Sequence, residues 1–398
     1  MNIRKEILEL TDELIHIRRD LHMHPELGFE EFRTADFIEQ YLKDLGLDPK
    51  RLAGTGVVAT MAGTAMGASD GPTLMLRSDI DALPIQEEND VPYRSLNNGV
   101  MHACGHDAHT AMLLISAKVL VNYRDKIHGK VKFLFQPNEE IAGAEIMVQE
   151  GALENPKVDA AMGIHIWTPL LSGQIGVTVG GVMASMDVFH LTIKGKGGHT
   201  GYPDSAIDPI ICAASLIETA QRIQTRDISL LKPTALMFAK INSGTKNNII
   251  PDEVELEGTL RYLYEPTDEF NPARSLEEVV QSVCAVHRCG YEFSIKTENE
   301  VVVNAPEMVR LVREAALGIV ENEQDVVEHR SMAGEDFAAY ASRVPSAFIH
   351  LGTRDPDKGT DYPHHSPRFN IDEDTMPTGV ELFVRTVEHF FDKNKISA

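Results

Sequence analysis

Short apolar segments alternate with segments of helical periodicity over residues 1–170. The apolar segments that read as strands are TGVVATMAG, PTLMLRSDID, VKFLFQP and VDAAMGIHIW. Apolar residues recur at helical spacing over 3–23, over 30–46 and in AHTAMLLISAKVLVNYRD. Strands that alternate with helices favour an α/β fold, in which a mostly parallel sheet carries helices on both faces.

The pattern changes near residue 186 and returns near residue 305. The segments of this stretch that read as strands are MDVFHLTIKGKGGH, LMFAKINSG, EVELEGTLRYL and YEFSIKTEN. With helices expected at 206–226 and 276–289, the order is strand, helix, strand, strand, helix, strand, which is that of a small α+β, ferredoxin-like domain. We therefore expect a main domain of residues 1–185 and 305–398 and an inserted domain of residues 186–304. A length of 398 residues is consistent with two domains.

The formal net charge of −23 argues against nucleic acid and membrane surfaces as partners, because both attract basic proteins. It is compatible with bound divalent cations. The charged N-terminal segment lacks the apolar core of a signal peptide, and no apolar run approaches the ~18 residues of a membrane span, so a cytoplasmic protein is expected. In that compartment the cysteines are expected to be free thiols. They are Cys104, Cys212, Cys284 and Cys289.

Residues 101–110, MHACGHDAHT, hold three histidines, a cysteine and an aspartate. If His102–His106 is extended, Cys104 and His106 point to the same side and can reach one centre. Thiolate and imidazole are ligands that suit Zn²⁺, Co²⁺ or Mn²⁺. Taken alone, a strand-to-helix turn with a buried cysteine and surface histidines explains the stretch equally well.

Other segments also place polar side chains at strand ends or in loops. Glu139 and Glu140 follow the strand VKFLFQP, at the edge where open α/β sheets carry their sites. One of them could bind a metal ion while the other acts as a general base, although a solvated helix start is the alternative. His165 ends the next strand, and His364 and His365 lie in a Pro-bounded loop. Each has an ordinary structural explanation, but together they favour a metal site.

The chain resembles the M20 metallopeptidase family, specifically its branch of hippurate hydrolases, N-acyl-amino-acid amidohydrolases and auxin-conjugate hydrolases. The matching segments follow the family order over nearly the whole chain; they are RRDLHMHPELGFEE, LRSDIDALPI, MHACGHDAHTAMLL, FLFQPNEE, GIHIW, GKGGHTGYPDSAIDPI, NIIPDEVELEGTLR, AGEDFAAY and HHSPRFNIDED. The resemblance implies a metal-dependent amidohydrolase that cleaves N-acyl-L-amino acids to a carboxylate and a free amino acid. The alternatives are an aminopeptidase, dipeptidase or N-acetyl-diaminopimelate deacetylase on the same scaffold, and a catalytically silent binding protein.

The resemblance also implies roles for individual residues. The implied ligands of two divalent ions (Zn²⁺, Mn²⁺, Co²⁺ or Ni²⁺) are Cys104, His106, Glu140, His165 and His365. Glu139 would take a proton from the attacking water and return it to the leaving amine. Asp79 stands where other branches have a ligating histidine, which puts direct ligation through it in doubt, and Asp81 is expected to orient a ligand instead. His102 and His109 are expected to support the ligands.

In the inserted domain the resemblance implies a lid over the main domain, a homodimer interface and contacts to the substrate. His199 of GGHTGYP would stabilise the tetrahedral oxyanion, in its own site or in the partner's. Asn248 and Arg261 would bind the substrate carboxylate, for which a planar guanidinium is suited. A surface salt bridge is the alternative for Arg261. The chain departs from the family's usual glycine run at Asn138 and Ile141, which leaves the size of the acyl group open.

Overall fold

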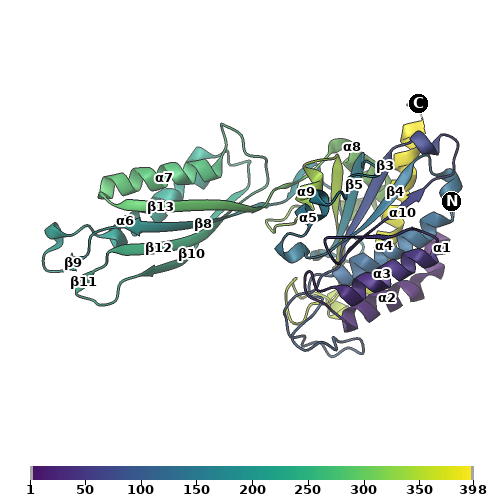
Figure 1. The fold of residues 1–398 in the computed structure, drawn as a ribbon, viewed down its shortest axis with the longest axis horizontal. Coiled ribbons are helices and arrows are strands. Elements are labelled where there is room, and N and C mark those ends of the chain that lie inside the picture. The colour runs from purple at the N-terminus through teal and green to yellow at the C-terminus, as the bar shows by residue number, and fades with distance from the viewer. Residues whose placement is uncertain (1–2, 396–398) are drawn as a thin grey trace. The chain divides into compact units, whose positions relative to one another are not determined.

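The computed structural model describes residues 3–395, which form two compact units (Figure 1). Unit 1 comprises residues 3–182, 303–330 and 336–395. Unit 2 comprises Met183–Val302 and Ser331–Glu335. The short segment Ser331–Glu335, which the sequence analysis placed in the main domain, thus belongs to unit 2. The lid and dimerisation roles expected for residues 186–304 stay predictions.

Unit 1 is built on an eight-stranded sheet in the order β1-β2-β4-β3-β5-β16-β6-β15. The strands are β1 (Lys50–Leu52), β2 (Gly56–Ala62), β3 (Thr73–Asp79), β4 (Lys130–Gln136), β5 (Ala160–Leu171), β6 (Ile175–Gly176), β15 (Val326–Val327) and β16 (Ser346–Arg354). The pairs β4–β3, β3–β5, β5–β16 and β6–β15 are parallel, whereas β1–β2, β2–β4 and β16–β6 are antiparallel. The expected α/β fold with a mostly parallel sheet is therefore confirmed.

Both faces of this sheet are covered. Every residue of β3 is buried, and so are nearly all residues of β5 and β16, although successive side chains point to opposite faces. The helices of unit 1 are α1 (Ile3–Glu9), α2 (Thr11–Met23), α3 (Phe32–Asp44), α4 (His106–Val121), α5 (Ala144–Gln149), α8 (Pro306–Leu317), α9 (Ala338–Ala341) and α10 (Met376–Lys395). Helix α4 is buried almost throughout because its sequence is apolar on every side, and it packs against β3, α2 and α10.

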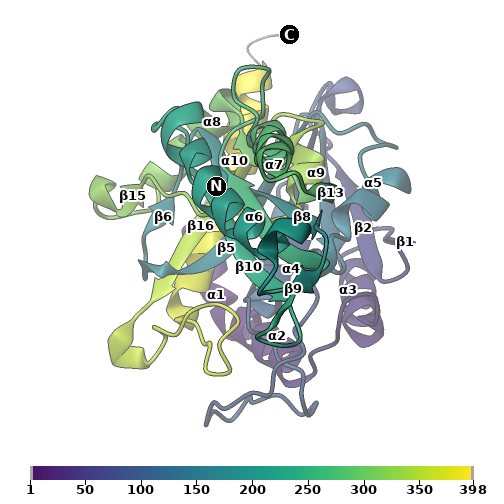
Figure 2. The ribbon, with the colours of Figure 1, turned by 90° about the vertical axis from the view of Figure 1, so that its left-hand side faces the viewer.

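Unit 2 has a four-stranded antiparallel sheet in the order β10-β12-β8-β13. Its strands are β8 (Ser185–Lys194), β10 (Thr234–Ser243), β12 (Glu253–Tyr262) and β13 (Gly290–Asn299). Helices α6 (Pro209–Ala220) and α7 (Pro272–His287) lie side by side and cover one face with an apolar core (Figure 2). The first strand thus lies between the third and the fourth, which is the order of the expected ferredoxin-like domain.

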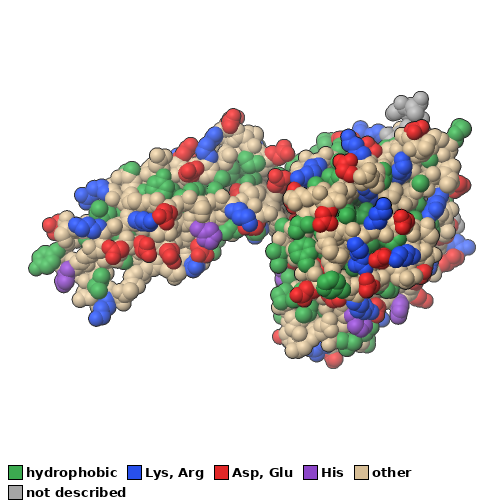
Figure 3. Space-filling model, viewed as in Figure 1, with side chains coloured by type: hydrophobic (Ala, Val, Ile, Leu, Met, Phe, Trp, Pro, Cys, Tyr) green, Lys and Arg blue, Asp and Glu red, His purple; other side chains and the backbone are tan. Residues whose placement is uncertain are grey.

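The other face of this sheet carries polar side chains. Burial alternates along β8 and β12 because every second residue faces the helices. Acidic and basic side chains are interspersed on the visible surface of unit 2 (Figure 3). Ion pairs connect neighbouring strands of this sheet, as in Lys240–Glu257 and Lys194–Glu292. Four further strands form separate two-stranded sheets: β9 (Gly198–His199) pairs with β11 (Ile249–Ile250), and β7 (Gly180–Met183) pairs with β14 (Val302–Asn304).

The cysteines are free thiols in the structure. Cys212 of α6 and Cys284 of α7 are buried, with their Sγ atoms 3.9 Å apart, whereas Cys289 is half-buried. Within residues 3–395, no helix combines the length and the apolar character that a membrane span requires.

Candidate metal centre

Three neighbouring parallel strands of unit 1 meet at one edge of the sheet, where β3 and β4 end. The expectation that His165 ends its strand is wrong, because β5 continues past this residue to Leu171. Arg77 of β3 lies opposite Gly163 of β5, so Asp79 and His165, each two residues further on, reach the same level. Asp79 pairs with Gln136, the last residue of β4, on its other side. The segments that follow these strand ends carry the remaining polar groups, as expected for an α/β sheet.

Cys104 and His106 come together through a turn. The expectation of an extended His102–His106 is wrong, because His106 is the first residue of α4 and Gly105 before it has φ +96°. This left-handed conformation suits glycine, and it lets the chain turn sharply into the helix. Cys104 and His106 still join His165 in one buried group, in which one potential ligand atom of each residue lies within 4.8 Å of the others.

The remaining expected ligands, Glu140 and His365, belong to further groups of this kind, and these groups share Cys104 or His106 with the first one. Cys104 groups with Glu140 and His365, and His106 groups with Glu139 and Glu140. Nε2 of His365 lies 3.3 Å from Oε1 of Glu140. The structure therefore brings the five expected ligands and Glu139 to one place, while their individual roles stay predictions.

The ring of His106 contacts Asp81 through one of its two nitrogen atoms. Its Nδ1 lies 3.0 Å from Oδ1 and 3.0 Å from the main-chain oxygen of Asp81, so the proton belongs on Nδ1. Its Nε2 is buried and has no hydrogen-bond partner among residues 3–395. A buried nitrogen next to thiolate, imidazole and carboxylate donors fits a divalent metal ion, which would satisfy it.

The charges of this centre are also unbalanced. Burial would lower the pKa of His106, but the carboxylates of Asp79 and Asp81 outweigh burial and raise the pKa to about 10. Burial lowers the pKa of His165 well below its usual range, which keeps this ring neutral and able to donate a lone pair. A site with several acids around one imidazole is suited to cations.

His109 belongs to a separate interaction. Its Nδ1 lies 2.6 Å from Oδ1 of Asp79, and its Nε2 accepts the N–H of Ile166 at 2.8 Å. Although Asp79, His106 and His109 lie close enough together to form a metal group, both nitrogens of His109 are engaged. Asp79 also accepts from Nη1 of Arg77 at 2.6 Å. This geometry argues against Asp79 and His109 as ligands.

Of the two other histidines of the motifs, His102 is buried and His364 is half-buried. Burial lowers the pKa of His102 to about 4, and neither of its nitrogens has a hydrogen-bond partner in the described part of the chain. Nε2 of His364 lies 3.0 Å from the main-chain oxygen of Ile166, and its ring packs 4.7 Å from that of Trp167. His364 therefore anchors the loop that presents His365.

A buried network, which the sequence analysis missed, connects the strand ends. Arg77 donates to Oε1 of Gln136 at 2.9 Å and to Oδ1 of Asp336 at 3.0 Å, and Gln136 donates to Asp336 at 2.7 Å. Asp336 also accepts the N–H of Ala144 at 2.8 Å. Burial raises the pKa of Asp336 to about 6, against the opposing effect of Arg77. The segment AGEDFAAY matched the family, but nothing in the sequence linked it to Arg77.

His199 is exposed in unit 2, at the end of β9. Its Nδ1 accepts the N–H of Gly201 at 3.0 Å, so the neutral ring carries its proton on Nε2 and can donate from there. Asn248 is exposed beside it, and its main-chain oxygen accepts the N–H of Thr200 at 3.3 Å. A pocket of about 500 Å³ adjoins these two residues; it is lined by Thr200, Asp208, Ile210, Ser243, Gly244, Thr245, Lys246, Asn247, Ile249, Ile250 and Pro251.

Arg261 of β12 has a half-buried guanidinium without a counter-ion. It donates to the main-chain oxygen of Met332 at 3.0 Å and contacts Sδ of Met186 at 3.0 Å. Burial lowers its pKa, and no carboxylate within residues 3–395 forms a salt bridge with it. Among the described residues, Arg261 therefore does not form the surface salt bridge that was the alternative expectation.

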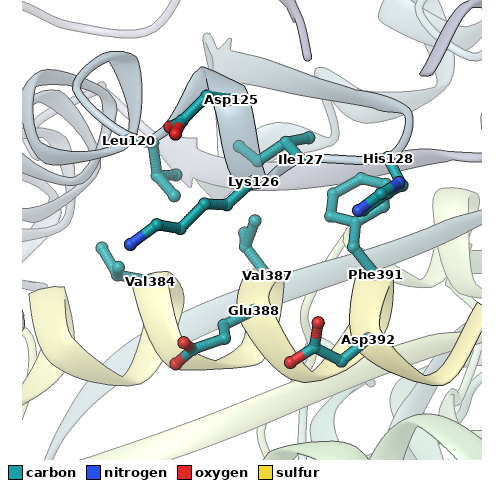
Figure 4. Close-up of a pocket in the computed structure, with 10 residues that line it drawn as sticks. All are labelled: Leu120, Asp125, Lys126, Ile127, His128, Val384, Val387, Glu388, Phe391 and Asp392. Carbon is teal, nitrogen blue, oxygen red and sulfur yellow. The ribbon is translucent and has the colours of Figure 1, made fainter. Parts of the chain in front are cut away.

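Figure 4 shows a different pocket of about 280 Å³, between α10 and the turn that follows α4. Its lining consists of Leu120, Asp125, Lys126, Ile127, His128, Val384, Val387, Glu388, Phe391 and Asp392. The apolar members are almost fully buried, and the pocket shares no residue with the candidate metal centre. It has no part in the chemistry considered below.

Comparisons with known proteins agree with this geometry. The profile of peptidase family M20/M25/M40 matches residues 75–389. An N-acyl-L-amino acid amidohydrolase of Geobacillus stearothermophilus is 40% identical over 80% of this chain and 89% of its own length. Thermostable carboxypeptidase 2 of Saccharolobus solfataricus is 36% identical over 95% of each chain. A crystal structure from Bacillus subtilis, described as a dinuclear metal-binding peptidase of the M20 family, superposes with a TM-score of 0.83 at 34% identity and covers 96% of this chain and 99% of its own.

The contact between Asp81 and His106 predicts an effect on metal affinity. We expect Asp81→Ala to weaken binding of Zn²⁺ or Mn²⁺ by about 10- to 100-fold, because Nδ1 of His106 loses the carboxylate that orients the ring and keeps only the main-chain oxygen as acceptor. Asp81→Asn should lose less, since its amide oxygen still accepts. Competition with a chelator measures both affinities, with the exposed Asp70→Ala as control. Equal affinities for Asp81→Ala and the unmodified protein would contradict this assignment.

Proposed function

The chain belongs to peptidase family M20 and is a hydrolase that acts on C–N bonds, and from this premise we propose that it hydrolyses the amide bond of N-acyl-L-amino acids. The products are a carboxylate and a free amino acid. The observation that carries the proposal is the convergence of Cys104, His106, Glu140, His165 and His365 with Glu139 at one edge of the sheet.

The proposed ligands would hold two divalent ions, Zn²⁺, Mn²⁺, Co²⁺ or Ni²⁺. The free Nε2 of His106 and the mixed thiolate, imidazole and carboxylate donors support this fit. When bound, such ions would polarise the substrate carbonyl and lower the pKa of water to ~7.

Glu139 is the proposed general base. It is 8% exposed, opens the short helical turn Glu139–Ile141, and places Oε2 3.9 Å from Nε2 of His106. It takes a proton from the water that attacks the amide carbon. It then delivers this proton to the amide nitrogen, so that the C–N bond breaks and the amine leaves neutral.

The proposed contacts of unit 2 concern the charged parts of the substrate. The unpaired, half-buried guanidinium of Arg261 is suited to the α-carboxylate. Asn248 lies beyond the opposite end of β12, next to Thr200, so it could serve as a second donor to the same carboxylate only from a partner chain. The Nε2 proton of His199 is suited to the oxyanion of the tetrahedral intermediate, where one donor contributes about 3 kcal/mol.

We also propose that the protein is a homodimer through unit 2. β10 is an edge strand of its sheet, and Met237 and Ile241 on it are 61% and 57% exposed. An edge strand with exposed apolar residues favours pairing with another chain. His199 would then act within its own site or in that of the partner.

A peptidase is the second candidate function, and the similarity to a carboxypeptidase favours it. The amide bond in a peptide and that in an N-acyl amino acid require the same base and the same metal ions. The two functions differ in the group on the acyl side of the bond, which the contacts described above do not select.

The role of Glu139 can be tested by a single substitution. We expect Glu139→Gln to lower kcat by about 10²–10⁴-fold, because the amide cannot take a proton from water. Metal content should stay that of the unmodified protein, since the amide leaves the expected ligands in place. The matched control is Glu145→Gln on α5, which should keep its activity. Near-normal turnover of Glu139→Gln with bound metal would show that another group is the base.

The substrate class can be tested with a panel of amides. We expect metal-loaded protein to release amino acids faster from N-acetyl-, N-benzoyl- or indoleacetyl-L-amino acids than from dipeptides of the same C-terminal residue. Arg261→Met should raise KM for these substrates more than it lowers kcat, since it removes a contact to the carboxylate. Faster release from the dipeptides would identify a peptidase instead.

The dimer and the site in which His199 acts can be tested by mixing two inactive variants. We expect His199→Ala to lower kcat by about 10²–10³-fold. If His199 acts in the partner's site, a dimer of one His199→Ala chain and one Glu139→Gln chain has one complete site and one inactive site. After random exchange of protomers about half of the dimers are such hybrids, so about a quarter of the activity returns. No recovery after proven exchange would place His199 in its own site.

A further inference from the structure

The proposed base is carried by a turn with an unfavourable backbone conformation. Asn138, which precedes Glu139, has φ +53°, and Ala142, which follows the turn, has φ +81°. Residues other than glycine seldom adopt these values, and they do so where the surrounding structure holds them. The contacts of this turn therefore matter for the direction in which Glu139 points.

Buried carboxylates accept hydrogen bonds from main-chain N–H groups in this turn and just after it. Oε1 of Glu31 accepts the N–H of Asn138 at 3.0 Å. Oδ2 of Asp81 accepts the N–H of Glu140 at 3.2 Å, and Asp336 accepts the N–H that begins α5, as described above. Asp81 and Asp336 have other partners in the metal centre and in the Arg77 network. Glu31, in contrast, contacts none of the expected ligands. Its effect on the turn can therefore be tested separately from metal binding.

Glu31 is well placed for this contact. It is fully buried just before α3, and its Oε2 accepts the hydroxyl of Thr55 at 2.5 Å. Burial raises the pKa of Glu31, whereas the hydrogen bond from Thr55 lowers it. In either protonation state the carboxyl group keeps a lone pair for the N–H of Asn138.

The segment around Glu31 also fits the turn by shape. A Cβ at Gly28 would lie 1.9 Å from Oδ1 of Asn138, so only glycine leaves room for that side chain. Phe29 next to it has φ +62°, which is rare for an aromatic residue. A close steric contact and a buried hydrogen bond thus connect residues 28–31 to Asn138, more than 100 residues further along the chain.

We propose that Glu31 is a positioning residue that fixes the main chain of Asn138 and so directs Glu139 toward the attacking water. This inference rests on the proposed function of Glu139 as the base. Glu31 itself touches neither the substrate nor the expected ligands. Its loss should therefore lower kcat without changing the binding of the substrate.

The test compares substitutions that break the contact in different ways. We expect Glu31→Leu to lower kcat by about 10- to 100-fold, because a small displacement of a reacting group has an effect of this size. KM should change by less than about twofold. Glu31→Gln should restore most of kcat, since its amide oxygen still accepts from Asn138. Gly28→Ala should reproduce the loss by pushing the side chain of Asn138 away, and it serves as the main variant if Glu31→Leu does not fold.

Glu26 supplies a matched control from the same segment. Its carboxylate accepts the N–H groups of Arg33 and Thr34 at 2.9 and 2.8 Å, in the first turn of α3, and it has no contact with Asn138. Glu26→Leu should lower the thermal stability but keep kcat. If Glu31→Leu and Gly28→Ala keep kcat, or lose it only as far as Glu26→Leu does, the proposal is overturned.

Amide hydrogen exchange of the metal-free protein gives a readout that does not depend on turnover. We expect the N–H of Asn138 to exchange at least about tenfold faster in Glu31→Leu and Gly28→Ala, with no change in Glu26→Leu. Unchanged exchange at Asn138 would overturn the proposal. If the unmodified protein hydrolyses no amide, the proposed function fails, and the exchange rates alone then decide whether Glu31 holds the turn.

Discussion

Charged side chains buried at the edge of a sheet need partners, because an unpaired charge in a low dielectric costs several kcal/mol. In unit 1 this requirement is met with short contacts. Asp107 lies 2.9 Å from Nε of Arg18 and 2.7 Å from Nδ1 of His22. Asp79 lies between Arg77 and His109. Much of the local arrangement follows from these pairings, since each one fixes a side chain and the element that carries it.

The same pairings determine which groups are left for chemistry. His109 is used on both nitrogens, whereas Asp81 engages only one nitrogen of His106 and leaves the other buried without a partner. The candidate metal centre is thus one place where the network is incomplete. An incomplete buried network is unfavourable by itself, and a bound cation would complete it. Buried carboxylates hold the turn that carries Glu139 through its main chain, since Glu31 accepts the N–H of Asn138 and Asp81 accepts the N–H of Glu140.

In unit 2, apolar packing rather than the pairing of buried charges holds the elements together. Its own apolar core of α6, α7 and one sheet face lets it form a stable layer, while the opposite face and the strand edge are solvent-exposed. His199, Asn248 and Arg261 have few contacts there, and Arg261 lacks a counter-ion. Residues with unused hydrogen-bonding capacity on a separate unit are suited to bind parts of a substrate rather than to stabilise the fold.

The sequence by itself determined the alternation of strands and helices, the inserted ferredoxin-like unit and the strand-end position of Glu139, because periodicity and turn residues are local properties. Without the family resemblance it did not separate His106 from His109, and it gave no role to Glu31 or Asp336. Their partners lie tens to hundreds of residues away, as Glu31 and Asn138 illustrate. Which nitrogen of His106 lacks a hydrogen-bond partner among the described residues follows from long-range packing, because that packing determines which donors and acceptors meet.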